Sequence, residues 1–209
     1  MDDTLKRLVG PPDLWEMKRA FQLDFLVKQG LMPRHSLLDF GCGVLRGGIP
    51  LISYLETSCY TGMDVRNEVL ELGWQEVCQL NLQDKKPALI HVPEGIPPPG
   101  DQVFDFIWAF AVLFHISDLI LPEVLSGLRQ RMHAGSVFFA NLHTGTREEG
   151  TWLEFPLMIR PWEEYTSLFE AAGLSIEDMG CLLDFGHVHP RLTLAEQMNQ
   201  RVIRTTLLS

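Results

Sequence analysis

Short apolar segments alternate with amphipathic ones along most of the chain. The segment 104–110 (FDFIWAF) is almost continuously apolar, as expected for a strand that is covered on both faces. Strands that alternate with helices predict a doubly wound, mostly parallel α/β sheet with right-handed crossovers and helices on both faces. Seven strands are expected, at 36–38, 60–64, 88–92, 104–110, 137–142, 174–183 and 201–208.

Helices are expected before the first strand and between later strands. Asp13 and Glu16 have the spacing of a capping box, which predicts that the first helix opens there and ends at Gly30. Asn67 is the expected N-cap of a helix whose apolar inner face includes Trp74. Further helices are predicted over 47–55, 117–135 and 161–173, and loops over 93–100 and 144–150.

We expect one domain over residues 1–209, in which residues 1–35 form a helical cap on the core 36–209. The first helix carries an apolar stripe, which suits either packing on the core or a lid over a ligand pocket. Trp15, beside that stripe, is the residue to test for a lid contact.

Composition narrows the functional classes. Hydrophobic residues make up 46% and charged residues 21%, which is ordinary for a globular protein. Seventeen Lys and Arg against 27 Asp and Glu give a net charge of −10, so nucleic acid is not an expected partner. The four cysteines share no CxxC spacing and are expected to be reduced thiols in the cytoplasm. The longest apolar run, 106–114, is too short to span a membrane, and residues 1–10 lack the apolar region of a leader.

The stretch 36–43 (SLLDFGCG) is the most informative in the chain. Asp39 stands at the carboxyl edge of the first expected strand, and Gly41 and Gly43 leave room for a ligand to approach the backbone. The dinucleotide fingerprint GxGxxG fails, because Arg46 stands where its third glycine belongs. Asp64, 21 residues after Gly43, can accept hydrogen bonds from two ribose hydroxyls. A ligand with a ribose but without phosphates fits this pattern.

Four stretches together resemble the class I, seven-stranded S-adenosylmethionine-dependent methyltransferases, and within them the small-molecule branch. LLDFGCGVLRGG (37–48) looks like the first motif of that family, and GMD (62–64) looks like its ribose acid. FDFIWAFAVLFHI (104–116) resembles its fourth-strand motif, and RPWEEYTSLFEAAGL (160–174) the helix before its sixth strand. The resemblance runs roughly from residue 37 to the C-terminus. It implies methyl transfer from S-adenosylmethionine to a small-molecule acceptor.

The resemblance also implies which residues bind this cofactor. Asp39 and the glycine turn should hold its methionine end, Asp64 its ribose, and the end of the fourth strand its sulfonium side. Arg46 either pairs with the methionine carboxylate or is a surface arginine. The family's third acid, which contacts adenine, has no clear counterpart, since 91–100 offers only Glu94; main-chain groups around His91 are the alternative. The full predicted set is Asp39, Gly41, Cys42, Gly43, Arg46, Asp64, Val65, Ala109 and Phe110.

Methyl transfer needs a base only when the acceptor carries a proton with a high pKa. His115 is the predicted base, because histidine titrates near neutral pH; the alternative is a histidine satisfied by nearby backbone groups. His187 and His189 lack a third metal ligand and are expected in a loop, so no metal is predicted. His143, Trp152, Trp162 and the apolar stretch 152–159 are candidates for an acceptor site or for core packing.

Two other functions fit the same pattern less well. A regulatory protein that binds the cofactor without turnover would keep the fold, and the missing adenine acid leaves that alternative open. A nicotinamide-dependent dehydrogenase is disfavoured by Arg46 in the glycine turn. The acceptor, the methylated atom and the oligomeric state are not specified by the sequence, and a homodimer is one alternative.

Overall fold

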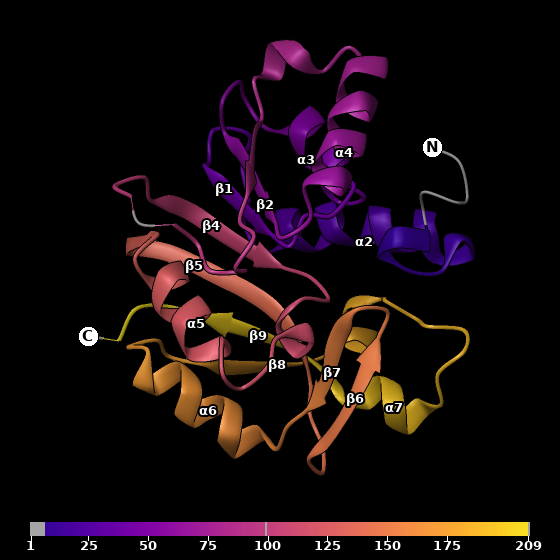
Figure 1. The fold of residues 1–209 in the computed structure, drawn as a ribbon, viewed down its shortest axis with the longest axis vertical. Coiled ribbons are helices and arrows are strands. Elements are labelled where there is room, and N and C mark those ends of the chain that lie inside the picture. Colours follow the sequence, from indigo (N-terminus) through magenta and orange to yellow (C-terminus); the bar gives the residue numbers. More distant parts are fainter. Residues whose placement is uncertain (1–6, 99, 209) are drawn as a thin grey trace. The chain divides into compact units, whose positions relative to one another are not determined.

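The computed structural model of the chain describes residues 7–98 and 100–208 (Figure 1). Seven strands form one mostly parallel sheet in the order β3-β2-β1-β4-β5-β9-β8, and β6 and β7 form a separate two-stranded sheet. The predicted seven-stranded α/β architecture is therefore confirmed. Contacts divide the chain into two compact units, Met1–Gly95 and Ile96–Ser209, each of which is described by itself.

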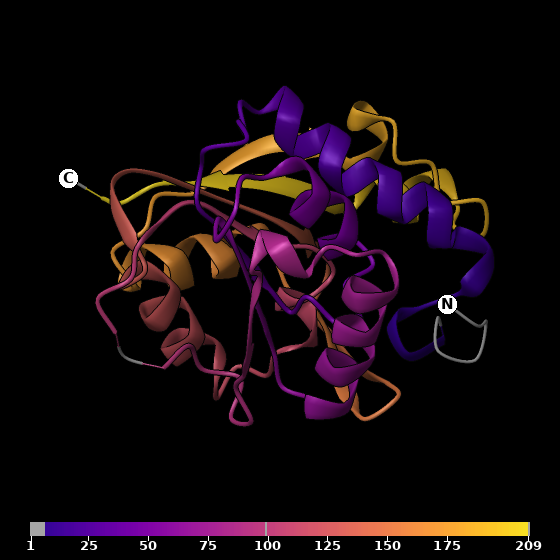
Figure 2. The same cartoon turned by 90° about the horizontal axis from the view of Figure 1, so that it is seen from above.

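The first unit contains the parallel strands β1, β2 and β3 together with helices (Figures 1 and 2). Every residue of β1 and β2 is buried, as expected for strands that are covered on both faces. The register sets Asp64 at the end of β2 level with His91 at the end of β3. The elements are η1 (Arg7–Val9), η2 (Pro12–Leu14), α2 (Trp15–Lys28), β1 (Leu37–Phe40), α3 (Gly48–Tyr54), β2 (Tyr60–Asp64), α4 (Asn67–Gln79), η3 (Gln83–Lys85) and β3 (Ala88–His91).

The second unit combines one parallel and three antiparallel strand pairs. Strands β4 and β5 are parallel, and β9 runs antiparallel to both β5 and β8. The hairpin of β6 and β7 contacts the short helix η4. The elements are β4 (Phe104–Ala109), η4 (Leu113–His115), α5 (Leu121–Arg129), β5 (Met132–His143), β6 (Glu148–Trp152), β7 (Phe155–Ile159), α6 (Trp162–Ala171), β8 (Glu177–Cys181), η5 (Leu182–Phe185), α7 (Leu194–Met198) and β9 (Gln200–Thr205).

Two predicted helix starts in the first unit are wrong. Helix α2 begins at Trp15 with Leu14 as its N-cap and without a side-chain capping hydrogen bond, because Asp13 lies inside the preceding 3-10 turn. In α4, Asn67 is the first helical residue, and its amide bonds to Glu71 one turn later. Trp74 is also not inward: it is 40% exposed, because the buried face of α4 lies on other residues.

Two boundaries in the second unit also differ from expectation. The helix predicted to reach Gly135 ends at Arg129, because β5 already starts at Met132 and pairs there with Phe104 of β4. The stretch 144–150 is not only a loop, since Glu148 begins β6 and pairs with Ile159 of β7. The predicted loop 93–100 contains no helix or strand in its described part; residue 99 lies outside the described residues.

Candidate functional site

The glycine turn after β1 has the open backbone that the sequence predicts. Gly41 and Gly43 have φ angles of 74° and 56°, a left-handed conformation in which side chains are disfavoured. The amides of Gly41 and Cys42 both donate to the carbonyl oxygen of Met63, at 2.8 and 3.0 Å. The turn is therefore tied to the carboxyl end of β2, where Asp64 stands.

Asp64 presents an oriented carboxylate beside this turn. Its side chain accepts hydrogen bonds from the amides of Gly43 (2.8 Å) and Arg66 (3.0 Å), and Arg66 Nε lies 3.7 Å from Oδ1. Only 6% of Asp64 is exposed, and burial raises its pKa against the lowering effect of these amides. A carboxylate has about four acceptor positions, so two donors leave capacity for further hydroxyl donors.

A second buried acid lies beneath the turn. Asp39 accepts a hydrogen bond from the Tyr60 hydroxyl at 2.7 Å, and burial raises the pKa of Asp39 to about 7. Arg46 is also buried, which contradicts the surface alternative for this residue; burial lowers its pKa to about 10, so it stays charged at neutral pH. Burial, together with the Arg46 charge, lowers the pKa of Lys18 in α2 to about 8.

Two residues of this group, Tyr60 and Lys18, were not indicated by the sequence as part of the site. Tyr60 was recognised only as a strand residue and Lys18 only as part of a helix. No local motif joins Tyr60 to Asp39, since the pair forms across neighbouring strands. Cys42, in the predicted set, is buried, and burial raises the pKa of its thiol well above the ordinary value, so it is a neutral thiol at pH 7. Trp15 packs with Val44 and Val69, as a core residue does.

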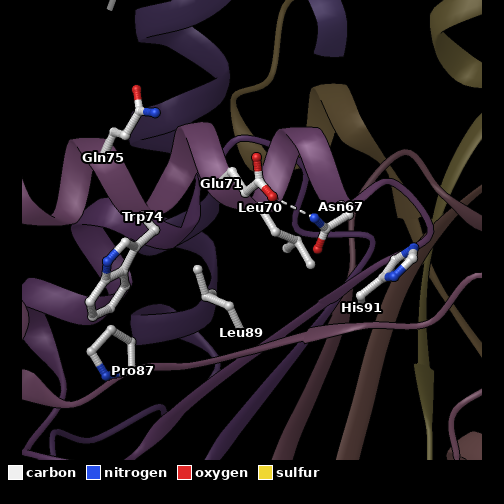
Figure 3. A pocket seen from close by; sticks show the side chains of 8 residues that line it. All are labelled: Asn67, Leu70, Glu71, Trp74, Gln75, Pro87, Leu89 and His91. Atoms are coloured by element: carbon white, nitrogen blue, oxygen red, sulfur yellow. Dashed lines mark hydrogen bonds between the residues drawn. The ribbon is translucent and has the colours of Figure 1, made fainter.

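A trench of about 640 Å³ runs between α4 and the edge strand β3 (Figure 3). Trp74 and Pro87 lie at one end, His91 lies at the other, and Leu70 and Leu89 lie between them. His91 Nε2 is 3.0 Å from the carbonyl oxygen of Val65, the residue after Asp64. The trench therefore ends beside the strand end that carries Asp64. Its lining is Asn67, Leu70, Glu71, Trp74, Gln75, Pro87, Leu89 and His91, with neither Lys nor Arg among them.

The predicted main-chain site near His91 is only partly accessible to a ligand. The amide of Val92 already donates to the carbonyl of Asp64 at 2.9 Å. Glu94, the only acid of this stretch, is exposed in the loop. The His91 ring is therefore a better candidate than the Val92 amide for contact with the nucleobase of a ligand.

In the second unit, Ala109 and Phe110 lie at the end of β4, as predicted. Both are buried, and the Phe110 ring stacks on Trp108 with centroids 5.5 Å apart. Ala111 follows with φ of 60°, and its amide donates to Asn141 Oδ1 at 2.6 Å. A positive φ is unfavourable for a non-glycine residue, so the surrounding structure must hold Ala111 in this conformation.

His115 belongs to an aromatic cluster between η4 and the β6–β7 hairpin. Its ring centroid is 4.6 Å from that of Phe114 and 5.2 Å from that of Trp152. His143 stacks on Phe114 at 4.1 Å. His115 Nδ1 lies 2.8 Å from the carbonyl oxygen of Pro156, which is 41 residues away and therefore not a nearby backbone group.

The remaining predicted residues are dispersed. His187 and His189 lie in a loop, as expected, and His187 is buried with its ring edge-on to Phe110 at 5.7 Å. Within the described ranges, no group of three potential metal-binding side chains is found. Trp162 is half-buried at the start of α6. No helix among residues 7–98 and 100–208 has the length and hydropathy of a membrane span.

Comparison with known proteins identifies the fold. Neither a family model nor a curated protein matches the sequence. Solved structures do match: an S-adenosylmethionine-dependent methyltransferase from Clostridium acetobutylicum (TM-score 0.68, 13% identity) covers 99% of this chain and 96% of its own. A Burkholderia thailandensis 1,6-didemethyltoxoflavin N1-methyltransferase, solved with its substrate and S-adenosylhomocysteine, has a TM-score of 0.70, 14% identity and coverage of 94% and 82%.

A third match is the magnesium protoporphyrin IX methyltransferase from Synechocystis, solved with bound S-adenosylmethionine. It has a TM-score of 0.68 and 14% identity, and covers 100% of this chain and 86% of its own. Identities this low establish shared architecture rather than shared activity. Together with the strand order, they show that the chain has the fold of the class I S-adenosylmethionine-dependent methyltransferases.

Proposed function

We propose that this protein transfers a methyl group from S-adenosylmethionine to a small-molecule acceptor. The observation that carries the proposal is the Asp64 carboxylate, held by two backbone amides at the carboxyl end of β2 next to a left-handed glycine turn. Ligands of parallel α/β sheets bind at this edge. Similar folds have been solved with the cofactor or its demethylated product bound, which supports the choice of ligand.

The residues of the first unit fit a nucleoside with an amino-acid tail. Asp64 would accept from the two ribose hydroxyls, and the turn at Gly41, Cys42 and Gly43 would lie against the tail. Arg46, a buried cation, would pair with the tail's carboxylate. Val65 and the His91 end of the trench would lie next to the adenine, since His91 is level with Asp64.

In the second unit, Ala109 and Phe110 would contact the sulfonium side of the cofactor, and His115 would be the base. The bound cofactor would supply an electrophilic methyl group on a good leaving group, so the protein needs chiefly to position the acceptor. Where the acceptor carries an O–H or N–H, His115 would take that proton. The net charge of −10 supports a small molecule rather than a nucleic acid.

Titration calorimetry with S-adenosylhomocysteine tests the cofactor site. Two charge-assisted hydrogen bonds contribute about 3 kcal/mol, so Asp64→Ala should weaken binding about 100-fold. Asp178→Ala, which removes a surface carboxylate of β8, is the matched control and should bind like the parent. Equal affinity of Asp64→Ala and the parent would contradict the assignment.

Turnover is tested separately by following S-adenosylhomocysteine release over a panel of small O–H and N–H acceptors. Methylation of a panel member that depends on Asp64 supports the enzyme. Binding of the cofactor without release over the panel favours the regulatory alternative.

A further inference from the structure

We propose that Arg160 is a positioning residue for His115, acting through Asp118 and the Ile116 carbonyl, and that the β6–β7 hairpin fixes Nε2 as the basic nitrogen of His115. The inference rests on the proposed function, in which His115 takes a proton from the acceptor. Arg160, Asp118, Ile116 and His115 all lie within the second unit.

Arg160, the residue after β7, is 0% exposed and holds the segment that follows His115. Its Nε donates to Asp118 Oδ1 at 2.8 Å, and its Nη2 donates to the carbonyl oxygen of Ile116 at 2.6 Å. The guanidinium carbon also lies 5.4 Å from the centroid of the Tyr165 ring. A buried guanidinium cannot lose its proton, so these acceptors are required and the geometry is fixed.

Asp118 is held from a second side by Arg147, which lies in the loop before β6. Arg147 bonds to Asp118 and Glu164, and its Nη2 lies 2.9 Å from Glu149 Oε1. Although burial acts in the opposite direction, the hydrogen bonds from Arg147 and Arg160 lower the pKa of Asp118. Asp118 therefore stays ionised at neutral pH and remains the counter-ion of Arg160.

The same hairpin also holds the His115 ring. Pro156 in β7 presents its carbonyl oxygen 2.8 Å from Nδ1. A carbonyl oxygen only accepts, so Nδ1 carries the hydrogen and the lone pair of the neutral ring is on Nε2. Pro156 thus fixes the ring while Arg160, four residues later, fixes the backbone just after it.

This arrangement has a chemical consequence for the proposed base. A proton from the acceptor would add to Nε2, and the resulting imidazolium would keep its Nδ1–H bond to Pro156. The ring would not need to turn between its neutral and protonated forms. Preorganisation of this kind is what allows a side chain to serve as a general base at a fixed site.

Nitrogen-15 NMR of histidine-labelled full-length protein reads the tautomer directly. The parent should show a protonated Nδ1 and an unprotonated Nε2 for neutral His115, a signal assigned by its loss in His115→Gln. Asp118→Asn and Arg160→Met should lose this single-tautomer signature and give averaged shifts for both nitrogens. Arg204→Gln, which breaks an exposed ion pair with Glu177, is the control and should leave the signature unchanged.

Each outcome decides the inference. A parent spectrum with the proton on Nε2, or a folded Asp118→Asn protein that keeps the parent signature, overturns it. If Arg160→Met fails to fold, Asp118→Asn decides alone, since that side chain is 41% exposed. Calorimetry with S-adenosylhomocysteine on the same samples separates the two proposals, because absent binding contradicts the function while the tautomer is read independently.

Discussion

The acids of the two units are held in opposite ways. In the first unit, Asp39 and Asp64 are buried among hydroxyl and amide donors, and burial raises the pKa of both. In the second unit, Asp118 is half-exposed and bonded to two guanidinium groups, which lower its pKa although partial burial opposes them.

This difference separates a binding site from a structural ion pair. A buried acid with a raised pKa is stabilised incompletely by the protein and gains when a ligand donates to it, so such groups mark functional sites. An acid between two arginines is already satisfied and serves to hold the chain. We therefore propose that Asp64 binds the ligand and that Asp118 positions its neighbours.

The largest effect is expected at Gly48 in the first unit, where a side chain would meet two buried neighbours. A Cβ added at Gly48 would lie 2.5 Å from the Tyr60 hydroxyl and 2.8 Å from a methyl group of Leu45. Tyr60 is buried and bonded to Asp39, so it cannot move away freely. Gly48→Ala should lower the free energy of unfolding by about 3 kcal/mol, measured by urea denaturation.

Gly150 in the β6–β7 hairpin is the matched control in the second unit. A Cβ there would meet Leu157 at 3.9 Å, an ordinary contact. Gly150→Ala should change stability by less than about 0.5 kcal/mol. If Gly48→Ala and Gly150→Ala lowered the stability equally, the inferred difference in packing between these two positions would be wrong.

A smaller effect is expected from the charge of Asp39. Its folded-state pKa of about 7 lies above the ordinary value of 3.8, so the folded protein binds more protons than the unfolded chain between these pH values. Stability should therefore fall as pH rises through this window. Asp39→Asn should be more stable than the parent at pH 8, on the order of 2 kcal/mol, and similar at pH 4, by thermal denaturation.

Asp118→Asn should change the stability at pH 8 in the opposite direction to Asp39→Asn. The lowered pKa of Asp118 gives stability that is present above its ordinary value of 3.8 and is lost as pH falls through the folded-state value. The variant should be less stable than the parent at pH 8, with a difference that shrinks at low pH. A shared sign for the two variants would contradict the assignment of the acids.

The smallest effect is expected along the trench. His91→Ala removes a ring beside the proposed adenine position, and one neutral hydrogen bond contributes about 1 kcal/mol, so S-adenosylhomocysteine should bind about fivefold more weakly. Trp74→Ala, at the far end of the same trench, should leave the affinity unchanged. A larger loss in Trp74→Ala would place the ligand along α4 rather than at the sheet edge.

The sequence predicted those features that depend on local pattern. Strand β2 and the turn with Gly41 and Gly43 follow from contiguous residues, and Asp64 follows from its spacing to that turn. Contacts between distant residues could not be predicted. Arg160 and Asp118 are 42 positions apart and meet only because the hairpin folds back, and no motif connects them.

The errors in the predicted helix boundary and in the predicted burial of Trp74 also arise from contacts between distant residues. The predicted helix included Met132 because this residue continues the apolar spacing of the helical face. In the structure, Met132 instead pairs with Phe104 of β4 and belongs to strand β5. Trp74 was predicted to be inward from helical spacing alone. Trp74 instead lines the trench between α4 and the edge strand β3, where it remains 40% exposed.

The most direct test of the cofactor site is a crystal structure of the protein with S-adenosylhomocysteine. We predict both ribose hydroxyls within about 3 Å of the Asp64 carboxylate oxygens, with the backbone of Gly41–Gly43 against the amino-acid tail. A complex in which the ribose lies elsewhere, and Asp64 keeps only its bonds to the protein, would contradict the account.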